Sequence, residues 1–231
     1  MPTDWQNDLD EFYSLLRELA KRVNGWRPLG RCSGRMVWPK LGVYFLTEPG
    51  ELRTIVPGEQ RVVRVGTHAL KSGAGSTLWG RLRQHRGTAN GGNHRGSVFR
   101  LHVGVALLEK LDARIDYRNW GVGSNATRQV RQGERKWEEL VSGHLAQMGV
   151  LCLPVEDEPG PGSDRGILER NSIALLSHFQ QPFDAPSPYW LGHQSPTACI
   201  RESGLWNVKH TLERYDPAFL ELLQHYVLAA G

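Results

Sequence analysis

The sequence has few cysteines and no long apolar run. Its three cysteines, Cys32, Cys152 and Cys199, are odd in number and far apart, which fits neither a disulfide framework nor a paired Cys-x-x-Cys zinc site. No window approaches the roughly 18 to 20 consecutive apolar residues that span a bilayer, and the opening MPTDWQNDLDEF lacks the basic and apolar regions of a signal peptide. We therefore expect a cytoplasmic protein without membrane contact.

Acidic residues are absent from one stretch of the chain. Between Arg61 and Arg100 the sequence holds 8 of its 28 Lys and Arg residues and none of its 24 Asp and Glu residues. The rest of the chain therefore has 20 cationic against 24 anionic side chains, so the positive excess of the whole chain, +4, comes from this stretch alone. The pattern predicts a surface for a polyanion; the alternative is a solvated basic face without a ligand.

Hydrophobic periodicity predicts an α+β domain in which a small antiparallel sheet is flanked by helices. The apolar spacing near the N-terminus indicates a helix that Asn24-Gly25 stops, and the last residues indicate a docked C-terminal helix. The expected elements between them are strands at 42–47 and 61–66, a helix at 78–85, a strand at 98–108, a helix at 138–149, a strand at 150–155 and a helix at 165–179 that Asp164 caps.

Two of these helices carry side chains suited to chemistry. Glu169 shares an apolar stripe with Ile173, which is costly unless the carboxylate is paired or binds a metal, so a structural salt bridge and a functional carboxylate both stay open. Arg81 and His85 are four residues apart and place a fixed cation beside a titratable imidazole, as solvated helix surfaces also do. The glycine-rich run at 71–77 before that helix lacks the Gly-Lys-Ser/Thr ending of a Walker A loop, but a phosphate-facing helix start remains open.

Taken in order, four motifs resemble the GIY-YIG nuclease superfamily. They are Gly42-Val43-Tyr44, Arg64-Val65-Gly66, the helix with Arg81, and Leu168-Glu169-Arg170-Asn171. Val43 replaces the usual isoleucine, and Arg64 stands where the family usually has tyrosine. His85 is similar to the histidine of the GIY-YIG restriction endonucleases, and residues 168–171 resemble the metal-binding helix of the bacterial excision-repair nuclease. The resemblance covers residues 40–85 and 138–180.

The resemblance implies an organisation and an activity. We expect an N-terminal helical extension at 1–38, a nuclease core at 39–210 with insertions at about 86–137 and 180–205, and a C-terminal helix at 211–231. The expected activity is metal-dependent endonucleolytic hydrolysis of DNA, and the insertions favour a restriction or defence enzyme. RNA stays open as a substrate, and cutting both strands of a duplex favours a homodimer.

The resemblance also assigns roles to residues. Glu169 is expected to hold one Mg²⁺ or Mn²⁺ ion, Arg81 and Arg64 to stabilise charge on the phosphoryl group, and Tyr44 to position or deprotonate the attacking water. His85 is expected to relay or accept the proton, to orient Tyr44 or to contact phosphate, and His68 is expected beside the attacking water. Asn207 is the candidate for the final motif asparagine, with Asn171 as the alternative. The residues expected to contact DNA are Lys71, Arg83, Arg86, His94 and Arg95.

Other interpretations remain. Because Arg64 replaces a tyrosine, a non-catalytic nucleic-acid-binding module on the same scaffold is the main alternative to an enzyme. A basic face for an acidic protein partner is the third. Residue by residue, Tyr44 is by default a core aromatic of a strand, and Gly42 and Gly66 are by default turn or packing glycines.

Overall fold

The computed structural model describes residues 4–160, 162–179 and 184–231, and its sheet is the predicted antiparallel one. Four strands lie in the order β1-β4-β2-β3. Their bounds are Arg27–Pro28 for β1, Gly42–Leu52 for β2, Gln60–Gly66 for β3 and Gly149–Pro154 for β4. Seven α-helices of the described residues surround the sheet, so the α+β prediction with an N-terminal helix is confirmed. These helices are α1 (Asp4–Arg22), α2 (Leu78–Arg86), α3 (Val98–Lys110), α4 (Arg128–Ala146), α5 (Asp164–Leu176), α6 (Ala198–Ser203) and α7 (Phe219–Ala229).

The β2–β3 hairpin fixes the register on which the site depends. Tyr44 is paired with Gly66 and Leu46 with Arg64, while Tyr44 faces Cys152 of β4 on its other side. The strand predicted at 42–47 continues to Leu52, and a register shift between Thr47 and Leu52 accommodates Pro49 and Gly50 within it.

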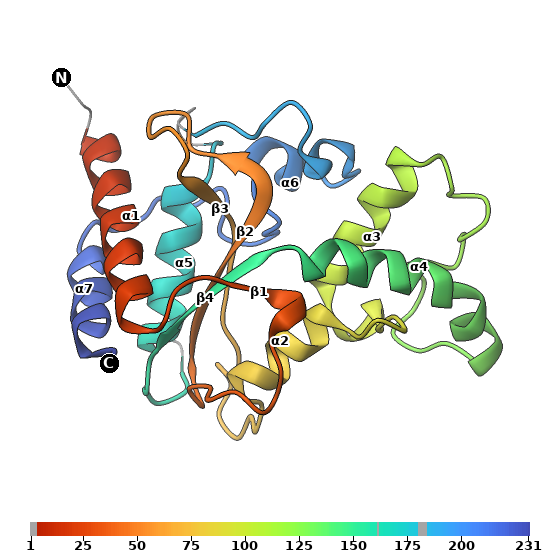
Figure 1. The fold of residues 1–231 in the computed structure, drawn as a ribbon, viewed down its shortest axis with the longest axis horizontal. Coiled ribbons are helices and arrows are strands. Elements are labelled where there is room, and N and C mark those ends of the chain that lie inside the picture. Colours follow the sequence, from red (N-terminus) through yellow and green to blue (C-terminus); the bar gives the residue numbers. More distant parts are fainter. Residues whose placement is uncertain (1–3, 161, 180–183) are drawn as a thin grey trace.

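The sheet separates two groups of helices (Figure 1). Because side chains alternate along a strand, Val43 and Phe45 of β2 belong to one apolar cluster and Tyr44 and Leu46 to the other. The first cluster includes apolar residues of α1, α5 and α7, and the second those of α2, α3 and α4. Tyr44 and the helix with Glu169 therefore lie on opposite faces of the sheet.

The predicted strand at 98–108 is wrong, because residues 98–110 form helix α3. Ser97 caps the helix by accepting a hydrogen bond from the Arg100 N–H at 3.2 Å. The segment was misread because burial nearly all round the helix makes its apolar run resemble a buried strand. Two helix starts also differ from the prediction: α4 begins at Arg128, ten residues early, and the cap of α5 is Ser163.

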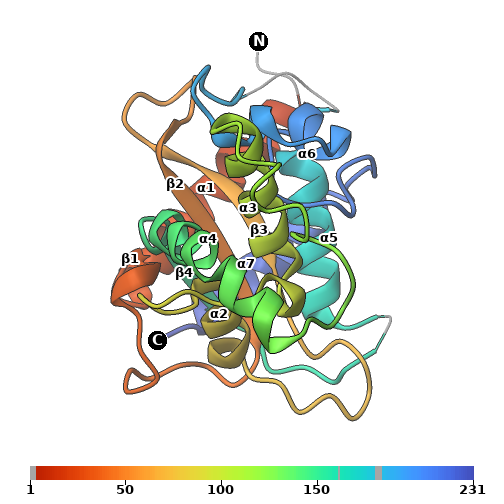
Figure 2. The same cartoon turned by 90° about the vertical axis from the view of Figure 1, so that its right-hand side faces the viewer.

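Residues 87–147 form a helical lobe that projects from the sheet. In Figure 1, α3 and α4 both extend away from the strands, and the connection between them lies at the right-hand end of the molecule, the side that faces the viewer in Figure 2. None of the described helices is both long and apolar enough to span a membrane. Cys32, Cys152 and Cys199 are free thiols.

Candidate active site

A pocket of about 550 Å³ brings together three of the predicted site residues, His68, Arg81 and Glu169. It lies where the end of β3, the loop after it, α2 and α5 meet. Thr77 caps α2 by accepting the Gly80 N–H at 3.1 Å, so the positive end of the helix dipole is at the pocket. The lining residues are Thr67, His68, Ala69, Leu70, Gly75, Ser76, Thr77, Gly80, Arg81, Arg83, Gln84 and Glu169.

Glu169 has no ion-pair partner among the described residues, although cations surround it. Its Oε1 accepts the backbone N–H of Thr67 at 3.1 Å. Burial raises the pKa of the carboxyl, while the nearby charges of Arg64, His210 and Arg81 and the Thr67 N–H oppose that rise. The salt-bridge interpretation of Glu169 is therefore not supported, and Oε2 remains for a ligand.

Arg165, one turn before Glu169 on α5, holds the same stretch of backbone. Its Nη1 donates to the carbonyl oxygen of His68 at 2.7 Å, and its Nε pairs with Asp157. The two α5 side chains thus fix the backbone at residues 67 and 68 from one helix face. Sequence reasoning missed Arg165, although its spacing of four residues from Glu169 was a usable signal.

One ring nitrogen of His68 has no hydrogen-bond partner among the described residues. Its Nδ1 lies 3.1 Å from the carbonyl oxygen of Ser76, which can only accept, so Nδ1 carries the proton and Nε2 has the free lone pair. Nε2 is buried and has no hydrogen bond within the described part of the chain. Burial, together with the charges of Arg165 and Arg81, lowers the pKa of His68 to about 4, so the ring is neutral at pH 7.

Tyr44 and His85 form a buried pair beside this pocket. The Tyr44 hydroxyl lies 2.8 Å from Nε2 of His85, and Nδ1 of His85 lies 2.8 Å from Oγ of Ser97. Both Tyr44 and His85 have an exposed fraction of 0%. Burial, with the charges of Arg64, Arg81 and Arg100, holds the pKa of His85 well below its usual range, so the imidazole is neutral.

Gly66 lies between the Tyr44–His85 pair and the pocket that contains Glu169. A Cβ at this position would lie 2.2 Å from the Tyr44 hydroxyl oxygen, so only glycine lets the phenol cross β3 here. The next residue, Thr67, donates its N–H to Glu169. Tyr44 and Glu169 therefore approach adjacent residues from opposite faces of the sheet.

Arg64 contributes a cation without a carboxylate partner. Its Nη1 donates to the carbonyl oxygen of Trp206 at 2.8 Å, its Cζ lies 4.6 Å from the Phe99 ring centroid, and its buried Nε has no partner among the described residues. The same guanidinium lowers the pKa of both Glu169 and His85, so its charge acts on both halves of the site.

The two candidate asparagines have structural bonds. Asn207 accepts the N–H of Val65 at 3.1 Å and donates to its carbonyl at 2.8 Å, and so it covers the free edge of β3. Asn171 donates to Ile167 and accepts the N–H of Asp216. Neither lines the pocket. His210, which lies close enough to Glu169 to lower its pKa, was missed, because no motif spacing connects it with that residue.

The residues predicted to contact DNA fall into two groups. Lys71 and Arg83 are exposed, and Arg83 lines the pocket. Arg86 donates to the carbonyl oxygens of Cys32 and Gly87.

His94 and Arg95 are instead paired within the fold. His94 Nδ1 lies 3.0 Å from a carboxylate oxygen of Glu138, and Arg95 Nη1 lies 2.6 Å from Glu134. Contact of either with nucleic acid would require these pairs to open, and their role stays a prediction.

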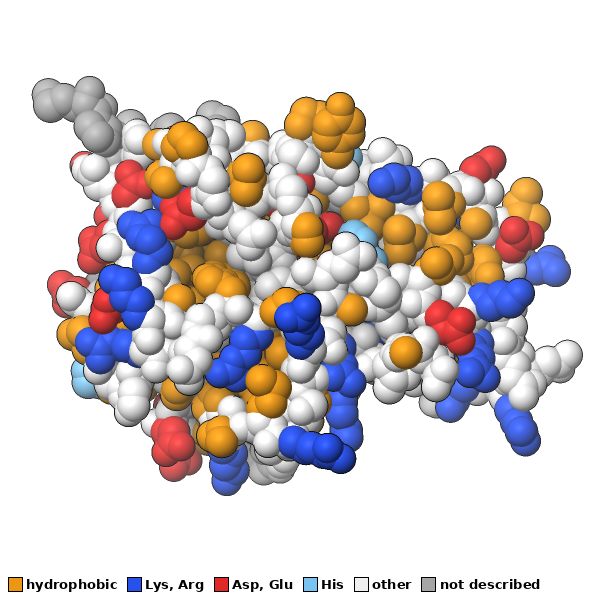
Figure 3. All heavy atoms as spheres, viewed as in Figure 1, with side chains coloured by type: hydrophobic (Ala, Val, Ile, Leu, Met, Phe, Trp, Pro, Cys, Tyr) orange, Lys and Arg blue, Asp and Glu red, His pale blue; other side chains and the backbone are white. Residues whose placement is uncertain are grey.

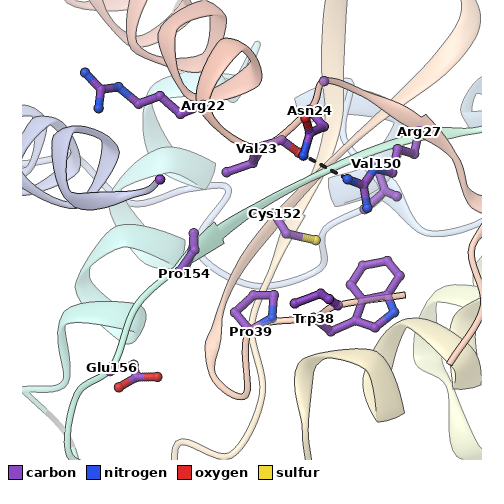
Figure 4. A pocket seen from close by; sticks show the side chains of 13 residues that line it. Arg22, Val23, Asn24, Arg27, Trp38, Pro39, Val150, Cys152, Pro154 and Glu156 are labelled. Carbon is purple, nitrogen blue, oxygen red and sulfur yellow. Dashed lines mark hydrogen bonds between the residues drawn. The ribbon is translucent and has the colours of Figure 1, made fainter. Parts of the chain in front are cut away.

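A second pocket, of about 450 Å³, contains none of the predicted site residues (Figure 4). It runs along β4, where the side chain of Cys152 lies near Trp38 and Pro39. Burial raises the pKa of the Cys152 thiol far above its ordinary value, which disfavours the reactive thiolate.

The donor set suits a metal that the protein shares with its substrate. Within the described ranges, no three His, Cys, Asp or Glu side chains come together as a metal cage. Mg²⁺ is commonly held by one or two carboxylates, with water and substrate phosphates completing its shell. Glu169, with one oxygen unengaged at a pocket that also holds Arg81, fits that mode of binding.

Comparisons with known proteins give one finding. The family model described as GIY-YIG domain matches residues 3–230, nearly the whole chain. No curated protein and no solved structure matches this chain.

Proposed function

Because the chain belongs to the GIY-YIG domain family, we propose that it is a divalent-metal-dependent endonuclease that hydrolyses DNA phosphodiester bonds. The domain is typically a nuclease, and its members generally use Mg²⁺ and act on nucleic acid. The observation that carries the proposal is the placement of Glu169, without an ion-pair partner, in one pocket with Arg81, beside the buried Tyr44–His85 pair.

The metal ion held by Glu169 and the side chains of Arg81 and Arg64 would stabilise negative charge on the phosphate. Glu169 would hold Mg²⁺ or Mn²⁺, which supplies a Lewis acid for the phosphoryl oxygens. The guanidinium of Arg81 makes one long side-chain hydrogen bond among the described residues, of 3.3 Å to Gln84, so its other donors would bind the scissile phosphate. Arg64 adds a second fixed positive charge, in the place where the family usually has a phenol.

Tyr44 and His85 form the proton-handling pair. His85 is neutral, and in the tautomer that carries its proton on Nδ1 this nitrogen donates to Ser97 while Nε2 accepts the hydrogen bond of the Tyr44 hydroxyl. Because the hydroxyl proton of Tyr44 then points to His85, a lone pair of the Tyr44 oxygen is left to orient the attacking water. Because the hydroxyl is fully buried, substrate or metal binding must first open a path to it. His68, with a free Nε2 in the pocket wall, is the second acceptor for the water proton.

We further propose a division of the chain and a biological class. Residues 39–210 constitute the nuclease core, with 1–38 and 211–231 as helical additions, and the helical lobe at 87–147 includes most of the inserted segment at about 86–137. A core enlarged by its own lobe suits a restriction or defence enzyme that recognises DNA through that lobe. Asn207 keeps β3 in place from its free edge.

Supercoiled plasmid provides the direct test. We expect nicking or linearisation with Mg²⁺ or Mn²⁺ and none with EDTA. Glu169→Gln should abolish cleavage while keeping an acceptor for the Thr67 N–H. Glu221→Gln, which changes an exposed carboxylate on α7, is the matched control and should cleave like the wild type. Equal cleavage by the two variants would contradict the proposed site.

One observation favours a second function, a non-catalytic nucleic-acid-binding module. Arg64 replaces a tyrosine, and Tyr44 has no exposed surface through which to meet water. Under this alternative, plasmid stays intact with every metal, and a gel shift weakens as salt increases.

A further inference from the structure

The outward face of α4 is the part of the helical lobe with the most free positive charge. Its first nine residues include four exposed cations and no large exposed hydrophobic side chain. Three arginines are spaced by three and four residues, so they lie along one face of the helix. We call this set the outer α4 surface; it consists of Arg128, Arg131, Arg135 and Lys136.

The acidic residues of α4 do not cancel this charge. Glu134 and Glu138 point inward, with side chains 6% exposed. Glu134 is paired with Arg95, and Glu138 with Arg100 and His94. The cations of the acid-free stretch thus neutralise the inner face of α4.

The outward cations are largely unpaired. Neither Arg128 nor Arg131 has an ion-pair partner in the part of the chain that the structure describes. Arg135 pairs at 3.1 Å with Glu139, and because both side chains are solvent-exposed the pair is weak. Figure 3 shows blue side chains gathered over the outer end of the lobe, where Figure 1 draws the first half of α4.

The surface also has a shape. The three arginines border a hollow of about 440 Å³, whose other walls include Gln132, Asn90 and Gly92. A Cβ at Gly92 would lie 2.5 Å from the guanidinium carbon of Arg100, so the loop lies directly on that buried side chain. The hollow is therefore built on a fixed floor. Its lining also includes Glu138, whose carboxylate is paired with Arg100 and His94, so the unpaired charge at the hollow is positive.

We propose that the outer α4 surface binds the phosphate backbone of duplex DNA, an inference that rests on the proposed nuclease function. Arg128 and Arg135 are about 10 Å apart along the helix axis at 1.5 Å per residue, a span that covers several phosphates. Arginine and amide donors without an apolar anchor suit a sugar-phosphate backbone better than a lipid surface or a hydrophobic protein face. The N-terminal end of the α4 dipole adds to the attraction.

Arg100 ties this surface to the catalytic helix. Its Nη1 donates to the carbonyl oxygens of His85 and Arg86 at 3.0 and 3.2 Å, and its Nη2 bonds Ser142 of α4 at 3.1 Å. The end of α2 and the middle of α4 are thus joined by one fully buried side chain. A duplex held by α4 is held by a body that is rigidly connected to Arg81 and His85.

The test measures binding without cleavage. A labelled 25-base-pair duplex is titrated in EDTA, by fluorescence anisotropy at several salt concentrations. We expect R128Q/R131Q to weaken binding about equally for unrelated sequences and to reduce the slope of log K against log salt by about 1.8, or 0.9 for each lost phosphate contact. R17Q/K21Q removes the same charge from exposed positions on α1 and should bind like the wild type.

Each result decides the proposal. Equal effects of the two double variants, or wild-type binding by R128Q/R131Q, would overturn it, as would displacement of the duplex by polyglutamate at equal charge. A wild-type protein that binds no duplex at low salt would also overturn it. Weakened binding by R128Q/R131Q with no plasmid cleavage by the wild type would leave the surface standing and refute the nuclease. Cleavage by the wild type with unaltered binding by R128Q/R131Q would support the nuclease function and refute DNA binding by the outer α4 surface.

Discussion

The hydroxyl of Tyr44 lies 2.8 Å from Nε2 of His85, and neither side chain has any exposed surface. His85 is held on its other nitrogen by Ser97, whose oxygen also caps α3 through the Arg100 N–H. Strand β2, helix α2 and the helical lobe are thus joined by one short series of hydrogen bonds. A substitution at His85 or Ser97 should therefore change the hydrogen bond that the Tyr44 hydroxyl makes.

Tyr44→Phe should reduce single-turnover cleavage by at least about 100-fold, the scale of acid–base and positioning effects. It should lower the free energy of unfolding by only about 1–2 kcal/mol, because Nε2 of His85 loses its buried partner while the ring stays packed. Urea unfolding measures the second quantity. Tyr189→Phe, at a side chain 90% exposed, is the control and should change neither. Cleavage by Tyr44→Phe within twofold of the wild type would remove Tyr44 from the mechanism.

Gly66→Ala should disrupt the site through packing. The new methyl group would lie 2.2 Å from the Tyr44 oxygen, so either the hydroxyl or β3 must move. We expect a loss of about 1–3 kcal/mol in the free energy of unfolding and loss of cleavage, because overpacking displaces both Tyr44 and the Thr67 N–H. Gly75→Ala, also beside the pocket but with no atom within 4 Å of the added Cβ, should leave stability nearly unchanged. Equal stability of the two variants would show that β3 yields easily at Gly66.

Arg64 tests whether a guanidinium replaces the family tyrosine in function. Arg64→Met removes the charge but keeps much of the apolar stem over Phe99, so cleavage should fall about 100-fold. Arg64→Lys keeps a cation without the fork of donors and should lose about 10-fold. Single-turnover rates on plasmid, with duplex affinity measured in EDTA, separate chemistry from binding. Equal rates for the two variants would mean that charge at this position does not assist the reaction.

The sequence predicted the sheet and helix α2 better than it predicted the lobe. Tyr44, Arg64, Gly66 and the α2 residues lie on short, strongly patterned elements, so local periodicity and motif order were enough to place them. Ser97 was missed as a helix cap because the following apolar segment is buried on almost every side and loses its helical period.

The basic stretch shows a different limit of sequence reasoning. Arg61, Arg95 and Arg100 lie in a segment without acid, yet each pairs with a carboxylate from another part of the chain. Charge counted along the sequence cannot show such pairs, because they form only when distant elements pack together. The same packing turns Glu134 and Glu138 of α4 inward and leaves the arginines of this helix facing solvent, which no linear count distinguishes.

The buried, neutral His68 predicts how stability depends on pH. Its pKa is about 4 in the folded protein, against 6.5 for the unperturbed group, so between these values the unfolded chain binds a proton that the folded chain does not. The free energy of unfolding should therefore fall as pH decreases from 6.5 towards 4, with a slope of up to about 1.4 kcal/mol per pH unit from this residue.

His68→Gln should remove this share of the slope. Urea midpoints at pH 7.5, 6.0 and 5.0 would show a smaller loss for the variant than for the wild type. Other groups with a lowered pKa, among them His85 and His102, would contribute to the slope that remains. His225→Gln, at an exposed position of α7, should follow the wild type and serves as the control. A His68→Gln variant that loses stability in parallel with the wild type would mean that His68 is protonated alike in both states. In that case its Nε2 would not be the free acceptor that the pocket wall requires, because burial without a partner is what keeps the ring neutral.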